Sequence, residues 1–575
     1  MIPSSSLQVS KLLIACGAIV SFALGSSAQT RTAPSTPQIG SPNTVTADPA
    51  VPRPKTQPCT VPLFSNFTFD NNFNLNPFQY TPPAECPGPW EKVVFQADIT
   101  VPAGRQFDRT ANVWIGGVNV YFGTTSEPQA TITRSWHVES DVTDYSSVFA
   151  VPQPGSIYLG NTVDSTYTSI LSANASLEFY PLVHHHPAPR TADIVLPLSS
   201  GPNGGSVYLN TPSDQNALTF VPPTNIERAY LDVIAQSQIG DEFWYTCVPN
   251  SVTAELETCG STAFREVEIT VDGQPAGVAP VYPWIYTGGI DPYLWRPIPG
   301  VETLNFSPYR VDLTPFAGVL SDGNQHQVGF SVFNNGNFWA TAGALLLYLD
   351  PASTEVTGKV TENTIGTPQP SVTLNLSPAP DGSVTGTVAV TSSRQFEIAG
   401  FVKTSHGEVR TEIRQNIDFS SVQTFDVNAS SPTGLPDIQN VNQKTTISSL
   451  TSRHGEGREE NTFVHADYPL LLNFSLVANP DGTFSQTTSV NQQLTREELA
   501  TIGDHPVRFS FLSESATPQD TLLFDSSFNL TGTQGQSSKE KYFYTNSEGT
   551  CYSRSIRAAN GLLTAVDDGD GCERH

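Results

Sequence analysis

The sequence predicts an all-β protein: two similar β-sandwiches side by side, followed by a β-rich C-terminal part. Short runs of β-type residues alternate with Gly- and Pro-rich turns, and no amphipathic helix longer than two turns is visible in the first half. A nine-residue motif also occurs twice, at 141–149 and 312–320, with the shared pattern Asp-aliphatic-Thr-x-aromatic-x-x-Val-apolar. Repetition of such a motif indicates a repeated structural unit.

The N-terminus has the features of a secretion signal. Lys11 precedes an apolar run at 12–24, and small residues at 26–28 follow it. This run is short for a membrane span, so we predict a signal peptide at 1–28 and a secreted protein, with a retained signal anchor as the alternative. Residues 29–58 are rich in Pro, Ser and Thr and are predicted to form a disordered or extended linker.

The charge balance is acidic, with 28 Lys and Arg against 54 Asp and Glu and a net charge of −26. Nucleic acids and anionic membranes require a basic surface, so neither is an expected partner. The cysteines beyond the signal fall into three close couples, for which local bridges are the simplest pairing in an oxidising compartment: Cys59 and Cys86, Cys247 and Cys259, Cys551 and Cys572. Sequons for N-glycosylation occur at Asn66, Asn174, Asn305, Asn375, Asn428, Asn473 and Asn529.

The pattern divides the chain into a first sandwich at 59–200, a second at 201–352 and a C-terminal part at 353–575. Strands are expected in the first sandwich at 92–101, 111–120, 131–136, 156–159 and 176–180. The C-terminal part is rich in Ser, Thr, Asn and Gln, with Pro-Asp-Gly turns at 380–382 and 480–482 and one short helix expected at 495–500, where Thr495 and Glu498 have capping-box spacing. All seven Trp residues lie between positions 90 and 339, so we expect the chemistry in the sandwiches and a supporting role for the rest.

Asp108 and Arg109 immediately precede the strand expected from residue 111, which ends at the turn Gly116-Gly117. A lone Arg is costly to bury, so the pair is expected at the mouth of the strand, beside a cleft between the sandwiches. A rim salt bridge is the structural alternative.

Acidic and aromatic residues also meet at 241–245, where Asp241 and Glu242 precede Trp244 and Tyr245 at the end of an apolar strand. Aromatic walls partly desolvate a carboxylate, which raises its pKa and suits it to proton transfer; an acidic turn is the alternative. Glu127 is placed either to face the same cleft or to occupy a turn. The Gly- and Pro-rich loop at 286–297 is suited equally to stacking on sugars and to packing one sandwich on the other.

No phosphate-loop, dinucleotide, nucleophile-elbow or zinc-protease motif is present, so no cofactor is expected. The three His residues at 184–186 lie between two Pro residues without nearby acids or Cys, which favours a solvated loop over a metal site.

Several motifs in fixed order across 90–350 resemble the peptide-N4-(N-acetyl-β-glucosaminyl)asparagine amidase A family, the secreted peptide N-glycosidases of plants and fungi. The C-terminal part resembles the family only loosely. The matching pieces are Gly104-Arg105-Gln106-Phe107-Asp108-Arg109, Trp114-Ile115-Gly116-Gly117, Thr125-Ser126-Glu127-Pro128, Trp136, Asp141-Val142-Thr143, Glu242-Phe243-Trp244-Tyr245, Phe264-Arg265-Glu266-Val267, Asp272-Gly273, Tyr286-Thr287-Gly288-Gly289-Ile290, Leu294-Trp295-Arg296-Pro297-Ile298 and Asp312-Leu313-Thr314-Pro315-Phe316.

A weaker similarity extends to the bacterial peptide N-glycosidases, which have two jelly-roll-like domains with a site between them. Their catalytic Asp, followed by Arg, lies in the first domain and a Glu lies in the second. Asp108-Arg109 and Glu242 are similar to these motifs, which implies that Asp108 and Glu242 oppose each other across the cleft. The insertion between Cys247 and Cys259 departs from the bacterial pattern.

The resemblance implies hydrolysis of the amide between Asn and the first GlcNAc of N-glycoproteins and glycopeptides, giving Asp and a glycosylamine. Asp108 would engage the amide and shuttle the proton, Glu242 with Glu127 would hold the water, and Arg109 would orient Asp108 or polarise the carbonyl. Arg105 and Arg296 are further substrate-binding candidates. Candidate platforms for sugar rings are Trp114, Trp136, Trp244 and Trp295, with Trp136 equally plausible as a core residue. The alternatives are a β-sandwich glycoside hydrolase and a glycan-binding protein without turnover.

Overall fold

A computed structural model describes residues 37–182, 188–431, 433–455, 457–569 and 572. The predicted signal peptide and the three His residues at 184–186 lie outside the described residues. Antiparallel strands make up the structure, and the helices found in the described residues contain only three or four residues each, so the all-β prediction is confirmed. Within the same ranges, no helix is long and apolar enough to cross a membrane.

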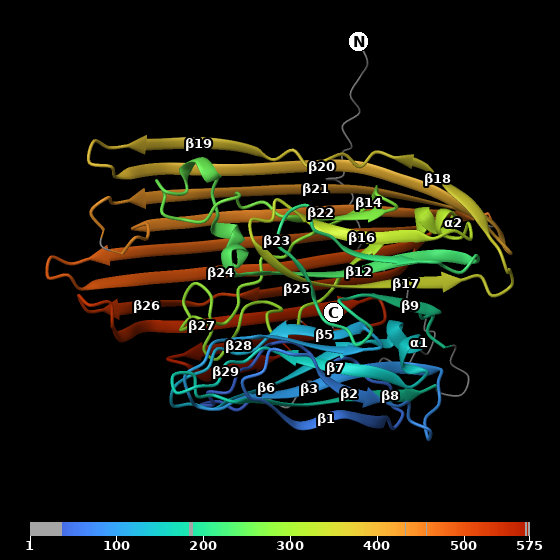
Figure 1. The fold of residues 1–575 in the computed structure, drawn as a ribbon, viewed down its shortest axis with the longest axis horizontal. Coiled ribbons are helices and arrows are strands. Elements are labelled where there is room, and N and C mark those ends of the chain that lie inside the picture. Colours follow the sequence, from blue (N-terminus) through green and yellow to red (C-terminus); the bar gives the residue numbers. More distant parts are fainter. Residues whose placement is uncertain (1–36, 183–187, 432, 456, 570–571, 573–575) are drawn as a thin grey trace, which may run out of the picture.

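The first unit consists of two four-stranded sheets packed face to face (Figure 1). One has the strand order β1 (Cys59–Phe69), β8 (Leu171–Pro181), β3 (Trp90–Val101), β6 (Arg134–Asp141). The other has the order β2 (Asn76–Tyr80), β7 (Gln153–Leu159), β4 (Thr110–Ile115), β5 (Val118–Thr124). The predicted β-sandwich of the first unit is therefore present.

The second unit repeats this order strand for strand. One sheet has the order β10 (Val207–Leu209), β17 (Phe338–Leu349), β12 (Ile226–Gln238), β15 (Tyr309–Asp312), with β9 (Ile194–Leu198) also pairing β17. The other has the order β11 (Asn216–Phe220), β16 (His326–Phe333), β13 (Glu266–Val271), β14 (Gln274–Pro280).

The repeated motif occupies equivalent places in the two units. Asp141 Oδ1 accepts a hydrogen bond from Thr143 N at 3.1 Å, and Asp312 Oδ1 accepts one from Thr314 N at 2.9 Å. In each unit the Asp ends a strand and a short helical turn follows, because the side chain satisfies a backbone donor that would otherwise lack a partner. These turns are η2 (Thr143–Tyr145) with α1 (Ser146–Phe149), and η6 (Thr314–Phe316) with α2 (Ala317–Leu320).

The C-terminal part forms one twelve-stranded sheet, whose long strands run across the upper half of Figure 1. The main order is β18 (Thr357–Asn363), β20 (Val384–Thr404), β21 (Gly407–Val427), β22 (Ile438–Gly455), β23 (Arg458–Ala478), β24 (Phe484–Ile502), β25 (His505–Ala516), β27 (Leu530–Asn546), β28 (Cys551–Ala559), β29 (Leu562–Asp568). β19 (Ser371–Pro378) pairs β20, and β26 (Gln519–Phe524) pairs β24 and β27. The Pro-Asp-Gly segments form turns after β19 and β23, as predicted.

The helix expected at 495–500 is wrong. Thr495 lies within β24, opposite Asp467 on one side and Ser513 on the other. The capping-box spacing is a local signal, and hydrogen bonding to two neighbouring long strands overrides it.

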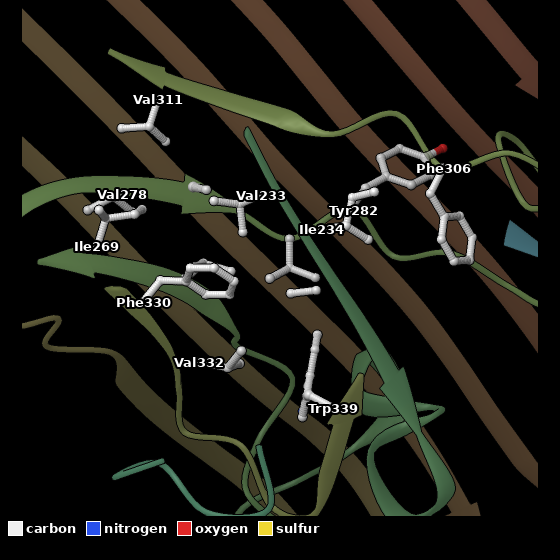
Figure 2. Packing of buried hydrophobic residues seen from close by; sticks show 14 of the residues in the cluster. Val233, Ile234, Ile269, Val278, Tyr282, Phe306, Val311, Phe330, Val332 and Trp339 are labelled. Atoms are coloured by element: carbon white, nitrogen blue, oxygen red, sulfur yellow. The ribbon is translucent and has the colours of Figure 1, made fainter. Parts of the chain in front are cut away.

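The sheet of the C-terminal part shares its core with the second unit. Buried residues from both belong to one cluster, and Figure 2 shows the contribution of the second unit around Ile234, Phe330 and Trp339. Across the interface, the rings of Phe264 and Phe419 lie 5.1 Å apart, centroid to centroid. The predicted supporting role therefore has a physical basis, because the long sheet keeps one apolar face of the second unit from water.

Residues 37–58 pack against the rest of the protein without regular secondary structure, so the disordered alternative is wrong for this stretch. Gly40 N donates to Leu563 O at 2.7 Å, and Tyr552 Oη donates to Ala47 O at 3.0 Å. Arg53 forms a 2.7 Å ion pair with Glu139. This N-terminal segment thus joins the first unit to the C-terminal sheet.

The three predicted local disulfides are all present: Cys59–Cys86, Cys247–Cys259 and Cys551–Cys572. Six of the seven sequon asparagines are exposed, and Asn305 is the half-buried exception. Asn305 Nδ2 donates to Glu139 O at 2.8 Å, and its Oδ1 accepts from Ser140 Oγ at 3.1 Å.

Candidate active site

Asp108 lies just before β4, where the first unit meets the second. Its Oδ2 accepts a 2.7 Å hydrogen bond from Gly288 N, which belongs to the long loop between β14 and β15. Its own backbone N–H donates to Glu127 Oε2 at 2.6 Å. The prediction that Asp108 faces a boundary between two sandwiches therefore agrees with its contacts, and the β4–β5 hairpin forms through the Gly116-Gly117 turn as expected.

Thr287 fixes the position of Glu127. The Thr287 hydroxyl accepts from Glu127 N at 2.7 Å, donates to Thr125 O at 2.9 Å and lies 3.4 Å from Asp108 Oδ2. Backbone groups of one unit are thereby satisfied by a side chain of the other, which makes the spacing of the two carboxyl groups dependent on how the units dock.

Only glycine fits at position 288 in this contact. A Cβ atom there would lie 2.8 Å from Asp108 Oδ1 and 3.0 Å from Glu127 Oε2. Any side chain would displace one of the carboxyl groups. Sequence reasoning assigned this loop to stacking or packing and missed that its backbone holds Asp108.

The neighbouring acids Asp241 and Glu242 have different environments. Asp241 is buried in a 2.9 Å ion pair with Arg265 and accepts from Trp339 Nε1 at 2.7 Å and Gly336 N at 2.8 Å. These bonds fix the chain where β12 ends, at the positive φ of Ile239. Glu242 follows as a half-buried residue, and no hydrogen-bond partner of its carboxyl group is found within the described part of the chain.

The electrostatics link the three acids. Burial raises the pKa of Asp108, despite the opposing hydrogen bond from Gly288. Burial raises the pKa of Glu127 to about 8 and that of Glu242 to about 7, and the charge of Asp108 is the second cause of both shifts. The charge of Asp108 therefore couples the titration of Glu127 and Glu242 to its own protonation state.

Arg109 and Arg296 supply positive charge near these acids. Burial lowers the pKa of Arg109, while the charges of Asp108 and Glu127 oppose that shift; Arg296 also favours the charged form of Glu127. Among the described residues no ion pair joins Asp108 to Arg109, and the Arg109 guanidinium donates instead to Gln106 Oε1. The predicted orientation of Asp108 by Arg109 is therefore replaced by the bonds from the loop of the second unit.

The four Trp residues proposed as sugar platforms are buried. Their exposed fractions are 0% for Trp114, 5% for Trp136, 1% for Trp244 and 1% for Trp295. A ring must offer one face to stack on a sugar, so this part of the site prediction is wrong. Trp295 has a supporting role, because its Nε1 donates to Gly289 O at 3.0 Å beside Gly288. The loop at 286–297 thus follows the packing alternative.

Exposed aromatic residues occur elsewhere in the two units, and one of them, Phe107, lies 5.8 Å from the Arg109 guanidinium. Phe107 is 49% exposed and its ring lies 5.3 Å from that of Tyr167. Tyr208 is 44% exposed and stacks on Phe338 at 4.9 Å. Arg105 is exposed, with its guanidinium 5.6 Å from the Tyr167 ring centroid. Sequence reasoning missed these rings because it ranked aromatics by size, and the largest ones were used for the core.

Comparisons with known proteins decide the family. The profile of the family "Peptide N-acetyl-beta-D-glucosaminyl asparaginase amidase A" matches residues 49–365. A Prunus dulcis protein, "Peptide-N4-(N-acetyl-beta-glucosaminyl)asparagine amidase A", is 30% identical over 547 residues, which is 91% of each chain. The chain belongs to the peptide N-glycosidase A family. The matched region contains Asp108, Glu127 and Gly288, which hydrogen bonds bring together, and Glu242, whose pKa the charge of Asp108 helps to raise.

Solved structures of two bacterial proteins show a more distant likeness. PNGase F, a glycosylasparaginase from Flavobacterium meningosepticum, aligns with 51% of this chain and 96% of its own, at 14% identity and a TM-score of 0.34. PNGF-II aligns with 51% and 66%, at 12% identity and a TM-score of 0.33. TM-scores of this size are too low to transfer residue positions from either protein.

Proposed function

We propose that this member of the peptide N-glycosidase A family hydrolyses the amide bond between Asn and the first GlcNAc of N-glycoproteins and glycopeptides. The products are an Asp-containing peptide and the glycan as a glycosylamine. The observation that carries the proposal is that Gly288 N and the Thr287 hydroxyl of the second unit hold Asp108 and Glu127 of the first, while the charge of Asp108 acts on Glu242.

The cluster provides the groups that amide hydrolysis needs. Water must lose a proton as it attacks the carbonyl carbon, and the departing nitrogen must gain one. Asp108, whose Oδ2 is oriented by Gly288 N, is placed to shuttle the proton. Glu242, with a pKa near 7 and the charge of Asp108 nearby, is suited to hold the water, and Glu127 is its partner in proton exchange.

Positive charge stabilises the oxygen of the tetrahedral intermediate. Arg109 is the nearer candidate, because its charge interacts with both Asp108 and Glu127. Arg296 lies over the ring of Tyr293, 3.9 Å from its centroid, and also acts on Glu127. A fixed guanidinium near a developing oxyanion lowers the barrier without rearrangement at the moment of reaction.

The exposed aromatic rings extend the proposal to substrate binding. Phe107, adjacent to Asp108 in sequence, packs with Tyr167 near Arg105, and Tyr208 with Phe338 forms a second exposed pair. Apolar faces of sugar rings pack on such aromatics, while hydroxyl groups find the polar neighbours.

The disulfides fit an extracellular protein. We infer further that the chain is secreted after loss of residues 1–28 and that its domains follow the predicted bounds of 59–200, 201–352 and 353–575, except that β9 (Ile194–Leu198) belongs with the second. The exposed sequon asparagines are available for glycans, whereas both polar atoms of the Asn305 side chain are hydrogen bonded.

Incubation of the secreted protein with a defined N-glycopeptide tests the activity directly. Mass spectrometry should show complete loss of the glycan and the small mass gain of Asn-to-Asp conversion in the peptide. A peptide that keeps one GlcNAc would indicate a glycoside hydrolase, and an unchanged glycopeptide that nevertheless binds would indicate a lectin-like protein; either result would reject the amidase proposal.

A further inference from the structure

A second cluster of acids lies away from the candidate active site, beneath the N-terminal segment. Asp48 belongs to that segment, Glu514 to β25 and Glu540 to β27. One carboxylate oxygen from each lies within 4.8 Å of the other two. Glu514 is 3% exposed and Glu540 is 2% exposed, so these acids are enclosed rather than solvated.

The cluster is short of partners. Glu540 Oε2 and Asp48 Oδ1 are buried without a hydrogen bond. Asp48 and Glu514 border a cavity of about 640 Å³ between the N-terminal segment, the first unit and the C-terminal sheet, and Glu302 also lines it. A buried carboxylate oxygen without a donor is costly, which points to a bound species that is not part of the chain.

The charge of Arg554 opposes the rise in the pKa of Glu540, but one guanidinium does not balance three acids. Arg554 lines the same cavity, but its Nε and Nη2 bind Asp568 at 2.6 and 3.2 Å. Glu302 adds a further acid. Three carboxylates at this spacing therefore need either a cation or protons.

The spacing favours a cation over a shared proton. Carboxyl groups that share a proton lie within hydrogen-bonding distance, as Asp291 and Asp520 do. Asp48, in contrast, acts on Glu514 and Glu540 through its charge. Calcium accepts carboxylate oxygens and water in flexible arrangements, which suits three acids from separate elements beside a cavity, whereas magnesium demands shorter and more regular contacts.

We propose that Asp48, Glu514 and Glu540 form a calcium site that links the N-terminal segment to the C-terminal sheet. The remaining ligands would be water molecules in the adjoining cavity, since calcium takes six to eight oxygens. In the same segment, Val45 N donates a hydrogen bond to Pro297 O at 3.1 Å. The calcium site would therefore also stabilise the position of the loop that follows Arg296. This inference is independent of the proposed amidase activity.

Metal analysis of the full-length secreted protein tests the site. After exposure to Ca²⁺ at pH 7 and dialysis into metal-free buffer, we expect about one Ca²⁺ per chain by elemental analysis. Chelation should lower the Tm by about 5 °C, and added Ca²⁺ should restore it. A chain that retains no Ca²⁺ and whose Tm is the same in chelator and in Ca²⁺ would overturn the proposal.

Variants separate this site from nonspecific binding. Glu514→Gln should abolish retention and remove the effect of Ca²⁺ on the Tm, while release of glycan from a glycopeptide continues. Glu548→Gln, in an exposed turn of the same sheet, should bind as the parent does. If Glu514→Gln does not fold, Asp48→Asn provides the same measurement, and a folded Asp48→Asn that still retains one tightly bound Ca²⁺ would contradict the assignment.

Discussion

Burial raises pKa values in both acid clusters of this protein, but the two clusters differ in what surrounds the oxygens. At the active site, Asp108 and Glu127 are half-buried and accept hydrogen bonds from backbone N–H groups. In the Asp48 cluster, two oxygens are buried without donors. The first arrangement keeps protons exchangeable beside a surface that a substrate can reach, and the second retains an ion. Exposure and donor supply, rather than the number of acids, distinguish a catalytic site from a structural one.

Removal of the charge of Asp108 has the largest expected effect and tests whether the first cluster is catalytic. Asp108→Asn keeps the shape of the side chain but cannot exchange a proton, so glycan release should fall about 10³-fold while the Tm stays unchanged. Initial rates on a glycopeptide and a thermal melt measure the two effects. Asp70→Asn, an exposed acid of the same unit, is the matched control and should retain activity. An active Asp108→Asn would remove Asp108 from the mechanism.

Gly288→Ala tests whether the backbone of the second unit positions the acids. The new Cβ would lie 2.8 Å from Asp108 Oδ1, so the carboxyl group must move, and we expect kcat/KM to fall about 10²-fold. Gly201→Ala adds the same atom where nothing lies within 4 Å and should be neutral. Equal activity in the two variants would show that Gly288 does not set the geometry.

The raised pKa values predict how stability depends on pH. Glu127 and Glu242, ordinarily near 4.5, titrate near 8 and near 7 in the folded protein. Their contribution to the free energy of unfolding is therefore fully present below about pH 4.5 and is lost as the pH rises through 7 and 8. Urea unfolding at a series of pH values, with Ca²⁺ held constant, should show this decline, and Glu127→Gln should flatten it. A decline of the same size in that variant would assign the pH dependence to other groups.

Substitutions of an exposed and a buried aromatic residue have the smallest expected effect on activity. Phe107→Ala removes an exposed ring beside Arg109, so KM for a glycopeptide should rise about 10-fold with little change in kcat. Trp244→Phe alters a ring that is 1% exposed, and should change stability rather than KM. Steady-state kinetics of the two variants side by side would show which class of aromatic contacts the substrate; a KM effect confined to Trp244→Phe would reverse the assignment.

The sequence by itself determined the features that depend on local pattern and on order along the chain. Strand periodicity and turn residues gave the all-β class, and the motif shared by 141–149 and 312–320 marks equivalent corners of the two units. The three disulfides followed from the closeness of their cysteines. Ordered motifs indicated the family that the comparisons establish.

Tertiary structure alone decided which side chains are accessible and which distant groups meet. Thr495 has capping-box spacing, but two neighbouring strands hold it in β24. Trp114 and Trp295 could have lined a surface, yet burying a large ring contributes more free energy than exposing it, and both are in the core. The bond from Gly288 N to Asp108 crosses 180 positions of sequence, and the approach of Asp48 to Glu540 spans almost the whole chain. Neither contact can be recognised from a local sequence pattern, because each exists only after separate sheets have packed together.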